Sequence, residues 1–209
     1  MKILLFEHPH TVTQDELNHD LLLLPDWRRK KVLSYHFLID QVLCAKAYLL
    51  LKKGLKDVYG IDDNPAFDYI GHEKPVLRDY PNIHFNLSHC KKGVMCVIAD
   101  HPIGCDIEEI EKKLDIRLCH SCYNDSEVAH ITSSAEPCIE FTKLWTRKEA
   151  ALKLTGEGIN EDLPSLFTPD TLNQLVFDTV VRQDCGFVYT VCNYVNTPYS
   201  ECGERIKEW

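Results

Sequence analysis

Short stretches rich in apolar and β-branched residues recur along the chain and predict β-strands. In the last two of these stretches, apolar and polar residues alternate, as they do in a strand with one buried face. The predicted strands lie near the start, in the middle and near the end of the chain: Lys2–Glu7, residues 83–88, 94–99 and 103–110, Leu175–Arg182 and Phe187–Tyr194.

The longest predicted helix covers residues 32–51, where apolar residues recur with a helical period over a broad face. Two lysines followed by Gly54 predict that this helix ends there, because glycine readily adopts the left-handed conformation that closes a helix. Residues 57–80 are rich in glycine and proline and are expected to be mostly loop.

Other helices are predicted from capping signals. Thr13-Gln-Asp-Glu16 has the form of a capping box and predicts a helix through residue 24, and Pro25 suits the first turn of the next helix. Residues 201–209 are polar and are expected to be loose. Helices are also expected in the second half, with Ser126 or Asp125 capping the second of them: residues 114–119, 125–133 and 137–154.

The composition is that of an ordinary globular protein, with 44% apolar and 26% charged residues in a chain of 209. A net charge of −9 argues against nucleic acid as a partner, since phosphate backbones select basic surfaces. Charges interrupt every apolar stretch well before it is long enough to cross a membrane. Ten cysteines without a secretory signal indicate free thiols in a reducing cytoplasm.

A pair of cysteines raises the question of a zinc site. Cys119-x-x-Cys122 lies close to His120, His130 and Cys138, and these are all residue types that ligate zinc. A single pair of this kind, without a second pair, is a weak indicator. A zinc site is therefore not expected here, and the sequence assigns no other role to this pair.

Two phrases carry most of the candidate chemistry: Ile103-Gly-Cys-Asp-Ile-Glu108 and Trp145-Thr-Arg-Lys-Glu-Ala-Ala-Leu-Lys153. On a strand, Asp106 and Glu108 project from the same face. On a helix, Trp145, Glu149 and Lys153 form one row. If the strand and the helix meet, three carboxylates converge, and a divalent cation with oxygen ligands would relieve their repulsion. Taken singly, each phrase is also compatible with solvated surface acids and an ordinary ion pair on a helix.

A third phrase, Phe85-Asn-Leu-Ser-His89, precedes these two, and Lys74-Pro75 lies upstream of it. Together, in their order and spacing, they resemble the signature of the 4′-phosphopantetheinyl transferases. The resemblance is to the long, single-chain surfactin-synthetase type, and it is best over residues 72–156.

This resemblance implies an α+β fold made of two similar α/β halves that form a pseudo-dimer, each a small antiparallel sheet packed with helices. Residues 1–101 would form the half that contacts the phosphates and adenine of coenzyme A. Residues 102–209 would form the half with the metal and catalytic residues. The active site would lie in the cleft between them, and the protein would act as a monomer.

The resemblance also implies roles for particular residues. Asp106, Glu108 and Glu149 would hold Mg²⁺, for which Mn²⁺ could substitute. Glu149 would also act as the base, and Lys153 would contact the departing phosphate. The family phrase also allows a phosphate contact at Lys148, although on an ideal helix this residue points away from Glu149 and Lys153. At the phosphates of coenzyme A, the contacts would be Arg28, Lys30, Ser88 and His89, with Lys31 in place of Lys30 if the match shifts by one residue. At the adenine, they would be Lys74 and Pro75. Glu73 stands where the family usually has glycine.

The implied reaction transfers the 4′-phosphopantetheine arm of coenzyme A to a serine of an apo acyl or peptidyl carrier protein and releases 3′,5′-ADP. Two alternatives use the same residues. A metal-dependent phosphodiesterase would cleave a nucleotide pyrophosphate with water, releasing 3′,5′-ADP without any carrier protein. A catalytically silent protein that binds coenzyme A or a carrier is disfavoured, because Asp106, Glu108, Glu149 and Lys153 are all present.

Overall fold

The computed structural model describes residues 1–72, 74–158 and 163–197. They form two three-stranded antiparallel sheets, a short hairpin and helices, so the predicted α+β class with small antiparallel sheets is confirmed. The predictions for Glu73 and for residues 201–209 concern positions outside the described residues. In the part of the chain that the structure describes, no helix is long and apolar enough to span a membrane.

The first sheet has the order β1-β5-β4, with β1 at Lys2–Glu7, β5 at Gly93–Ala99 and β4 at His84–Cys90. Every residue of the central strand β5 is buried. Val94, Cys96 and Ile98 belong to the core shared with helix α3, whereas Met95 and Val97 belong to the core shared with the second sheet. Burial of both faces explains why this strand is a continuous apolar run.

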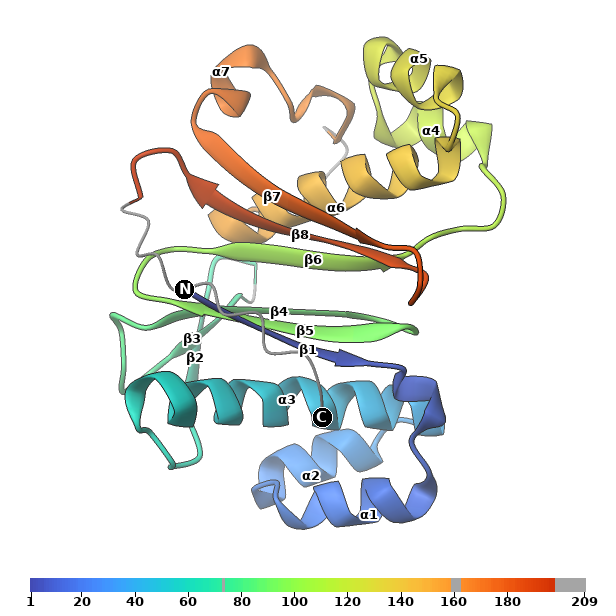
Figure 1. The fold of residues 1–209 in the computed structure, drawn as a ribbon. Helices are drawn as coiled ribbons and strands as arrows, with labels where there is room; N and C mark the ends of the chain where they lie inside the picture. Colours follow the sequence, from blue (N-terminus) through green and yellow to red (C-terminus); the bar gives the residue numbers. More distant parts are fainter. Residues whose placement is uncertain (73, 159–162, 198–209) are drawn as a thin grey trace.

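The second sheet has the order β6-β8-β7, with β6 at Gly104–Glu109, β8 at Phe187–Tyr194 and β7 at Leu175–Arg182. The bounds of β7 and β8 are those predicted from the sequence. Phe187, Tyr189 and Val191 pack with Cys105 and Ile107 against the first sheet. The two sheets therefore lie against each other, between α3 on one side and α6 on the other (Figure 1).

Helix α3 covers Leu38–Tyr59, so the predicted helix of residues 32–51 had both ends wrong. Residues 32 and 33 belong instead to α2 (Asp26–Leu33). At the other end, α3 continues through Gly54, where a Cβ atom would lie 2.3 Å from Ile98 Cδ1. That glycine allows the helix to approach the sheet closely, and Gly60, with φ of 69°, closes the helix.

Helix α1 (Gln14–Leu22) begins with the predicted capping box, in which the Thr13 amide donates to Glu16 Oε2 at 2.7 Å. Pro25 lies just before α2 as its N-cap residue. Both helices pack on the side of α3 that faces away from the sheets (Figure 1). They complete the first half of the molecule.

Helix α6 (Pro137–Thr155) covers the second sheet, and Gly104 sets how closely it approaches. A Cβ atom on Gly104 would lie 2.0 Å from the carbonyl oxygen of Ala150. The helix ends at Gly156, whose φ is 81°. The glycine at 104 therefore brings the carboxylates of β6 directly against the α6 residues predicted to form a row.

Helices α4 (Ile116–Cys122) and α5 (Asp125–Ser133) pack near the start of α6 (Figure 1). The N-cap of α5 is Asn124, not Ser126 or Asp125 as predicted, because Glu127 completes a capping box with Asn124. Three shorter helices also form: η1 (Pro9–Thr11), η2 (Leu163–Ser165) and α7 (Pro169–Leu172).

A hairpin of β2 (Phe67–Ile70) and β3 (Lys74–Leu77) lies within the segment predicted to be mostly loop. Strand β2 is largely exposed, whereas every residue of β3 is at least partly buried, so neither short strand alternates between buried and exposed residues. Pro75 is tolerated because the hairpin has only two strands and each is an edge. The hairpin carries Lys74 and Pro75 toward the end of α6.

Candidate active site

Ser88, Asp106 and Lys153 meet although they come from β4, β6 and α6. The Ser88 hydroxyl donates to Asp106 Oδ1 at 2.7 Å. Lys153 Nζ donates to the same oxygen at 2.6 Å and to Ser88 Oγ at 3.0 Å. The strand and the helix that carry the two main sequence phrases therefore meet, which is the condition under which their carboxylates converge, and Ser88 joins them from the first sheet.

Glu149 and Glu108 complete the cluster around Asp106, which is 1% exposed. Glu149 Oε2 lies 4.0 Å from Lys153 Nζ, one helical turn away. On β6, Cys105 and Ile107 face the first sheet, so Asp106 and Glu108 face α6. The predicted row of residues on α6 and the predicted carboxylate face of β6 therefore lie opposite each other.

The protonation equilibria reflect a surplus of negative charge. Burial, and then the charge of Asp106, raises the pKa of Glu108 to about 7, against the opposing effects of Lys153 and a hydrogen bond from Trp145. Burial likewise raises the pKa of Glu149. Burial by itself would lower the pKa of Lys153, but the charge and hydrogen bond of Asp106 raise it. Three carboxylates thus share one ammonium group.

The cluster fits a hard divalent cation in its donor atoms. Asp106 Oδ2 is buried and has no hydrogen-bond partner among the described residues, so it is an acceptor still to be satisfied. Carboxylate oxygens are the ligands that Mg²⁺ prefers. The oxygens of Asp106, Glu108 and Glu149 do not all lie within 4.8 Å of one another, and Lys153 is bonded to Asp106 Oδ1. A cation would have to draw these carboxylates together.

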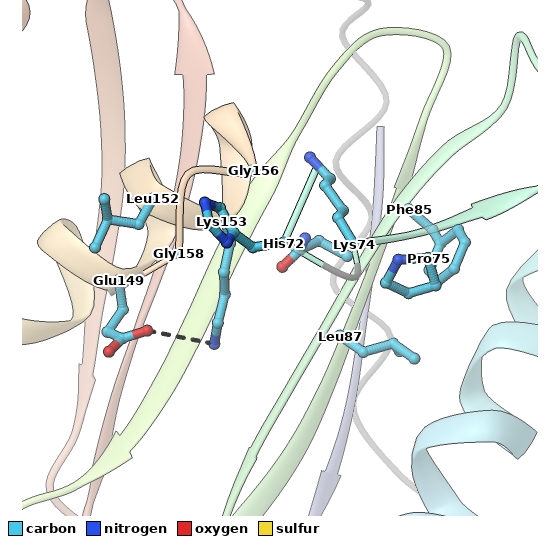
Figure 2. Close-up of a pocket in the computed structure, with 11 residues that line it drawn as sticks. His72, Lys74, Pro75, Phe85, Leu87, Glu149, Leu152, Lys153, Gly156 and Gly158 are labelled. Atoms are coloured by element: carbon cyan, nitrogen blue, oxygen red, sulfur yellow. Dashed lines mark ion pairs between the residues drawn. The ribbon is translucent and has the colours of Figure 1, made fainter. Parts of the chain in front are cut away.

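A cavity of about 350 Å³ adjoins the cluster, and its walls come from both halves (Figure 2). Lys74 Nζ donates to the carbonyl of Leu154 at 2.9 Å, and burial lowers the pKa of this lysine. The cavity therefore contains four predicted site residues, together with wall residues that the sequence had not singled out. The lining residues are His72, Lys74, Pro75, Phe85, Asn86, Leu87, Glu149, Leu152, Lys153, Gly156 and Gly158.

Asn86 is the unpredicted residue whose role is clearest. Its side-chain oxygen accepts the backbone N–H of Cys105 at 3.2 Å, which joins β4 to β6 beside the cavity. The residue lies within the phrase that ends in Ser88 and His89, so its place in that phrase was the available signal. The loop at His72 approaches Gly156 in a similar way, since the His72 amide donates to the Gly156 carbonyl at 3.5 Å.

The predicted phosphate-binding residues of the first half are more dispersed. Arg28 donates to the Cys44 carbonyl at 2.9 Å and lies 5.4 Å from the centre of the Tyr48 ring, whereas Lys30 is exposed on α2. The pKa of His89 is lowered, first by partial removal of its ring from water and then by the charge of Lys153, with a smaller contribution from Arg28. The charges of Arg28 and Lys153 thus act on His89, but Arg28, Lys30 and His89 are not among the residues that line the cavity.

Comparison with known proteins identifies the family. Residues 102–184 match the model of the 4′-phosphopantetheinyl transferase superfamily. One relative, 4′-phosphopantetheinyl transferase psf-1 of Bacillus pumilus, is 34% identical over 141 residues, which are 66% of this chain and 60% of that protein. The chain belongs to the 4′-phosphopantetheinyl transferase superfamily. The matched range contains Asp106, Glu108, Glu149 and Lys153.

Two further relatives are similar over different extents. The 4′-phosphopantetheinyl transferase gsp of Aneurinibacillus migulanus is 34% identical over 131 residues, 61% of this chain and 54% of that protein. The 4′-phosphopantetheinyl transferase Sfp of Bacillus subtilis (strain 168) is 25% identical over 168 residues, 79% of this chain and 75% of that protein. This superfamily member thus spans less than two thirds of the length of psf-1 and of gsp.

Lys148, also within the matched range, does not face the cavity. Its ammonium group is wholly buried and donates to the carbonyls of Cys122 at 3.0 Å and Leu163 at 2.7 Å, and to Glu127 Oε2 at 2.8 Å. An ammonium group has three N–H donors, so none is left for a phosphate. The predicted phosphate contact is wrong, and Lys148 instead ties α6 to α5 and η2.

The cysteine pair packs in the core of this superfamily member. Cys119 and Cys122 are buried with Tyr123, Val128 and Phe141, whereas His120 is exposed. Neither cysteine belongs to a group of three metal-ligand side chains in the part of the chain that is described. The thiols there act as small apolar groups.

Proposed function

We propose that this chain transfers the 4′-phosphopantetheine arm of coenzyme A to a serine hydroxyl of an apo acyl or peptidyl carrier protein and releases 3′,5′-ADP. The observation that carries the proposal is the meeting of Asp106, Glu149 and Lys153 beside a cavity lined from both halves. The names of the relatives, all 4′-phosphopantetheinyl transferases, support it.

The proposal includes a pseudo-dimer of two halves, residues 1–101 and 102–209, with the active site in the cleft between them. Two observations support it. Each half contributes a three-stranded antiparallel sheet covered by one long helix. The Ser88 hydroxyl of the first half bonds to Asp106 of the second. Such a protein would act as a monomer in the cytoplasm, without nucleic acid or membrane as a partner.

Asp106, Glu108 and Glu149 would hold Mg²⁺, or Mn²⁺ in its place; the unpartnered, buried Asp106 Oδ2 supports this role. The cation would neutralise charge on the pyrophosphate of coenzyme A and act as a Lewis acid. The other proposed contacts to the coenzyme are Lys74 and Pro75 at the adenine, and Arg28, Lys30, Ser88 and His89 at the phosphates.

In the reaction, a bond forms between the carrier serine oxygen and the phosphorus next to pantetheine, and the bond from that phosphorus to the bridging oxygen breaks. Glu149 would accept the serine proton, directly or through water. Lys153 would exchange its bonds to Asp106 and Ser88 for a phosphate oxygen and stabilise the charge on departing 3′,5′-ADP.

Mass spectrometry of candidate apo-carriers tests the proposal. Incubation with the protein, coenzyme A and magnesium should add about 340 Da to a carrier, the mass of the transferred phosphopantetheine. EDTA or Asp106→Ala should stop the transfer, and excess magnesium should restore it only in the EDTA-treated wild type. Release of 3′,5′-ADP without a carrier would favour a phosphodiesterase instead, and coenzyme binding without either product would refute any catalytic role.

A further inference from the structure

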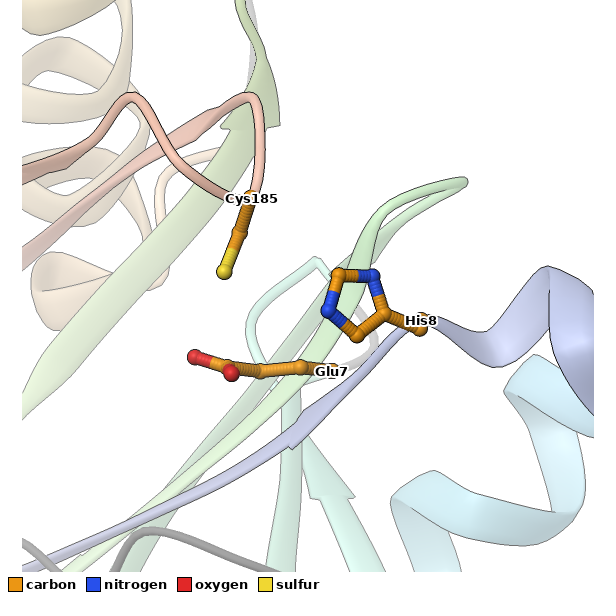
Figure 3. Close-up of side chains that lie close together, drawn as sticks. All are labelled: Glu7, His8 and Cys185. Atoms are coloured by element: carbon orange, nitrogen blue, oxygen red, sulfur yellow. The ribbon is translucent and has the colours of Figure 1, made fainter.

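Three potential metal ligands meet at the end of the molecule where β1 ends and the turn between β7 and β8 lies. Glu7 is the last residue of β1, His8 follows it, and Cys185 lies in that turn (Figure 3). One ligand atom from each residue lies within 4.8 Å of the other two. In the described ranges, this is the one group of three such side chains that meets this criterion.

The chemistry of these three ligands differs from that of the carboxylate cluster at the cavity. A carboxylate, an imidazole and a thiolate together suit Zn²⁺ and related divalent ions, whereas Mg²⁺ prefers oxygen ligands alone. Cys185 is buried, Glu7 is half-buried and His8 is exposed, so an ion could enter from the solvent on the side of the imidazole. The His8 backbone is fixed in a left-handed conformation, with its amide donating to the Lys92 carbonyl at 3.1 Å.

The cluster already attracts a cation, because the guanidinium group of Arg182 lies among its acceptors. Arg182 Nη1 donates to Glu7, and Nη2 donates to Asp184 Oδ2 at 2.8 Å and lies 3.1 Å from Cys185 Sγ. Two carboxylates thus face one guanidinium while the thiol is protonated, so one negative charge is uncompensated. Arg182 can keep its bond to Asp184 if it releases Glu7 and Cys185 to an incoming ion.

We propose that Glu7, His8 and Cys185 form a binding site for Zn²⁺ or a similar borderline divalent cation. Binding forms bonds from the metal to a Glu7 oxygen, a ring nitrogen of His8 and the Cys185 sulfur, and the thiol proton is lost to solvent; water takes the remaining position. The metal, the thiolate and the Glu7 carboxylate then sum to zero charge, and Arg182 and Asp184 neutralise each other. Because β1 belongs to the first sheet and Cys185 to the second, the ion would clip the two sheets together. The inference is independent of the proposed transferase activity.

Cobalt, which reports thiolate ligation in its absorption spectrum, is the probe for this site. Titration of the reduced, metal-free full chain with Co²⁺ should give a thiolate-to-cobalt charge-transfer band with the intensity of a single thiolate ligand; cobalt held by the carboxylates at the cavity gives no such band. Cys185→Ser should abolish the band, and His8→Ala should weaken binding by at least roughly tenfold, the loss caused by removing even an outer partner of a metal ligand. Cys90→Ser, which removes another partly buried thiol, and Asp106→Ala, at the cavity, should leave the band unchanged.

A stability measurement provides the second readout. Zn²⁺ should raise the unfolding temperature of Asp106→Ala, which lacks the cavity cluster, and not that of Asp106→Ala/Cys185→Ser, because an ion that binds only the folded state stabilises it. Arg182→Gln should tighten Co²⁺ binding, since it removes the competing guanidinium. No charge-transfer band at saturating Co²⁺, a band that survives Cys185→Ser, or an Arg182→Gln variant whose band does not saturate at lower Co²⁺ would each overturn the proposal and leave an ion-pair network at this site.

Discussion

Replacement of Lys148 by methionine is predicted to destabilise the fold strongly. The change removes three hydrogen bonds and leaves the Glu127 side chain, 13% exposed, without its ammonium partner. Breaking a buried pair in this way costs about 3–5 kcal/mol, because a largely buried carboxylate is left without its cation. For a chain of this size, the unfolding temperature should fall by roughly 6–20 °C. Thermal unfolding followed by circular dichroism measures this shift.

Lys143→Met is a matched control on the same helix. Lys143 is bonded to Glu140, and its side chain is 28% exposed. Its loss should cost less than about 1 kcal/mol, as for other surface ion pairs. The double variant Lys148→Met/Glu127→Gln removes the unpaired negative charge of Glu127 but keeps a side-chain oxygen that can accept the Asn124 amide. It should therefore be more stable than Lys148→Met alone. A Lys148→Met protein within about 1 kcal/mol of the wild type would refute the reasoning.

Further predictions concern the cavity. Lys153→Ala should lower kcat on the order of 10²-fold or more and leave the magnesium requirement unchanged, whereas Glu149→Gln should impair both; steady-state kinetics across a magnesium titration separates them. Coenzyme A should bind more tightly than 3′-dephospho-coenzyme A. Calorimetry of His89→Ala or Lys30→Ala should show a smaller difference in affinity between these two ligands. An unchanged affinity difference in both variants would mean that the 3′-phosphate binds elsewhere. Because the pKa of Glu108 is raised from 4.5 to about 7, the metal-free protein should lose stability as pH rises through that range, and Glu108→Gln should flatten the loss in pH-dependent unfolding curves.

The sequence predicted the elements whose residues are buried on regular faces. The bounds of β1, β7 and β8 were correct, because apolar residues on these strands face a packed core. The hairpin of β2 and β3 was missed because neither of its short strands alternates between buried and exposed residues. Gly54 was misread because its function depends on Ile98, which is distant in the sequence. Local pattern could not distinguish a glycine that ends a helix from one that lets it pack closely.

The site was predicted to a similar extent. The spacing of Glu149 and Lys153, and that of Asp106 and Glu108, correctly gave the two faces that meet. The bond from Ser88 to Asp106 joins strands of different sheets, so no spacing within one element could have predicted it. The roles of these residues in metal binding and catalysis remain predictions that the kinetic experiments test.

The two lysines of the Trp145–Lys153 phrase show why a motif cannot be converted into a site residue by residue. Five positions on a helix correspond to a rotation of about 140°, so Lys148 and Lys153 face nearly opposite directions. Lys153 donates to Asp106 at the cavity, whereas Lys148 donates to backbone carbonyls and to Glu127 in the core. Lys148 thereby ties α6 to α5, and a helix fixed on one side can hold Glu149 and Lys153 at a defined distance from β6 on the other. The phrase therefore combines residues that face the cavity with a residue that holds them there.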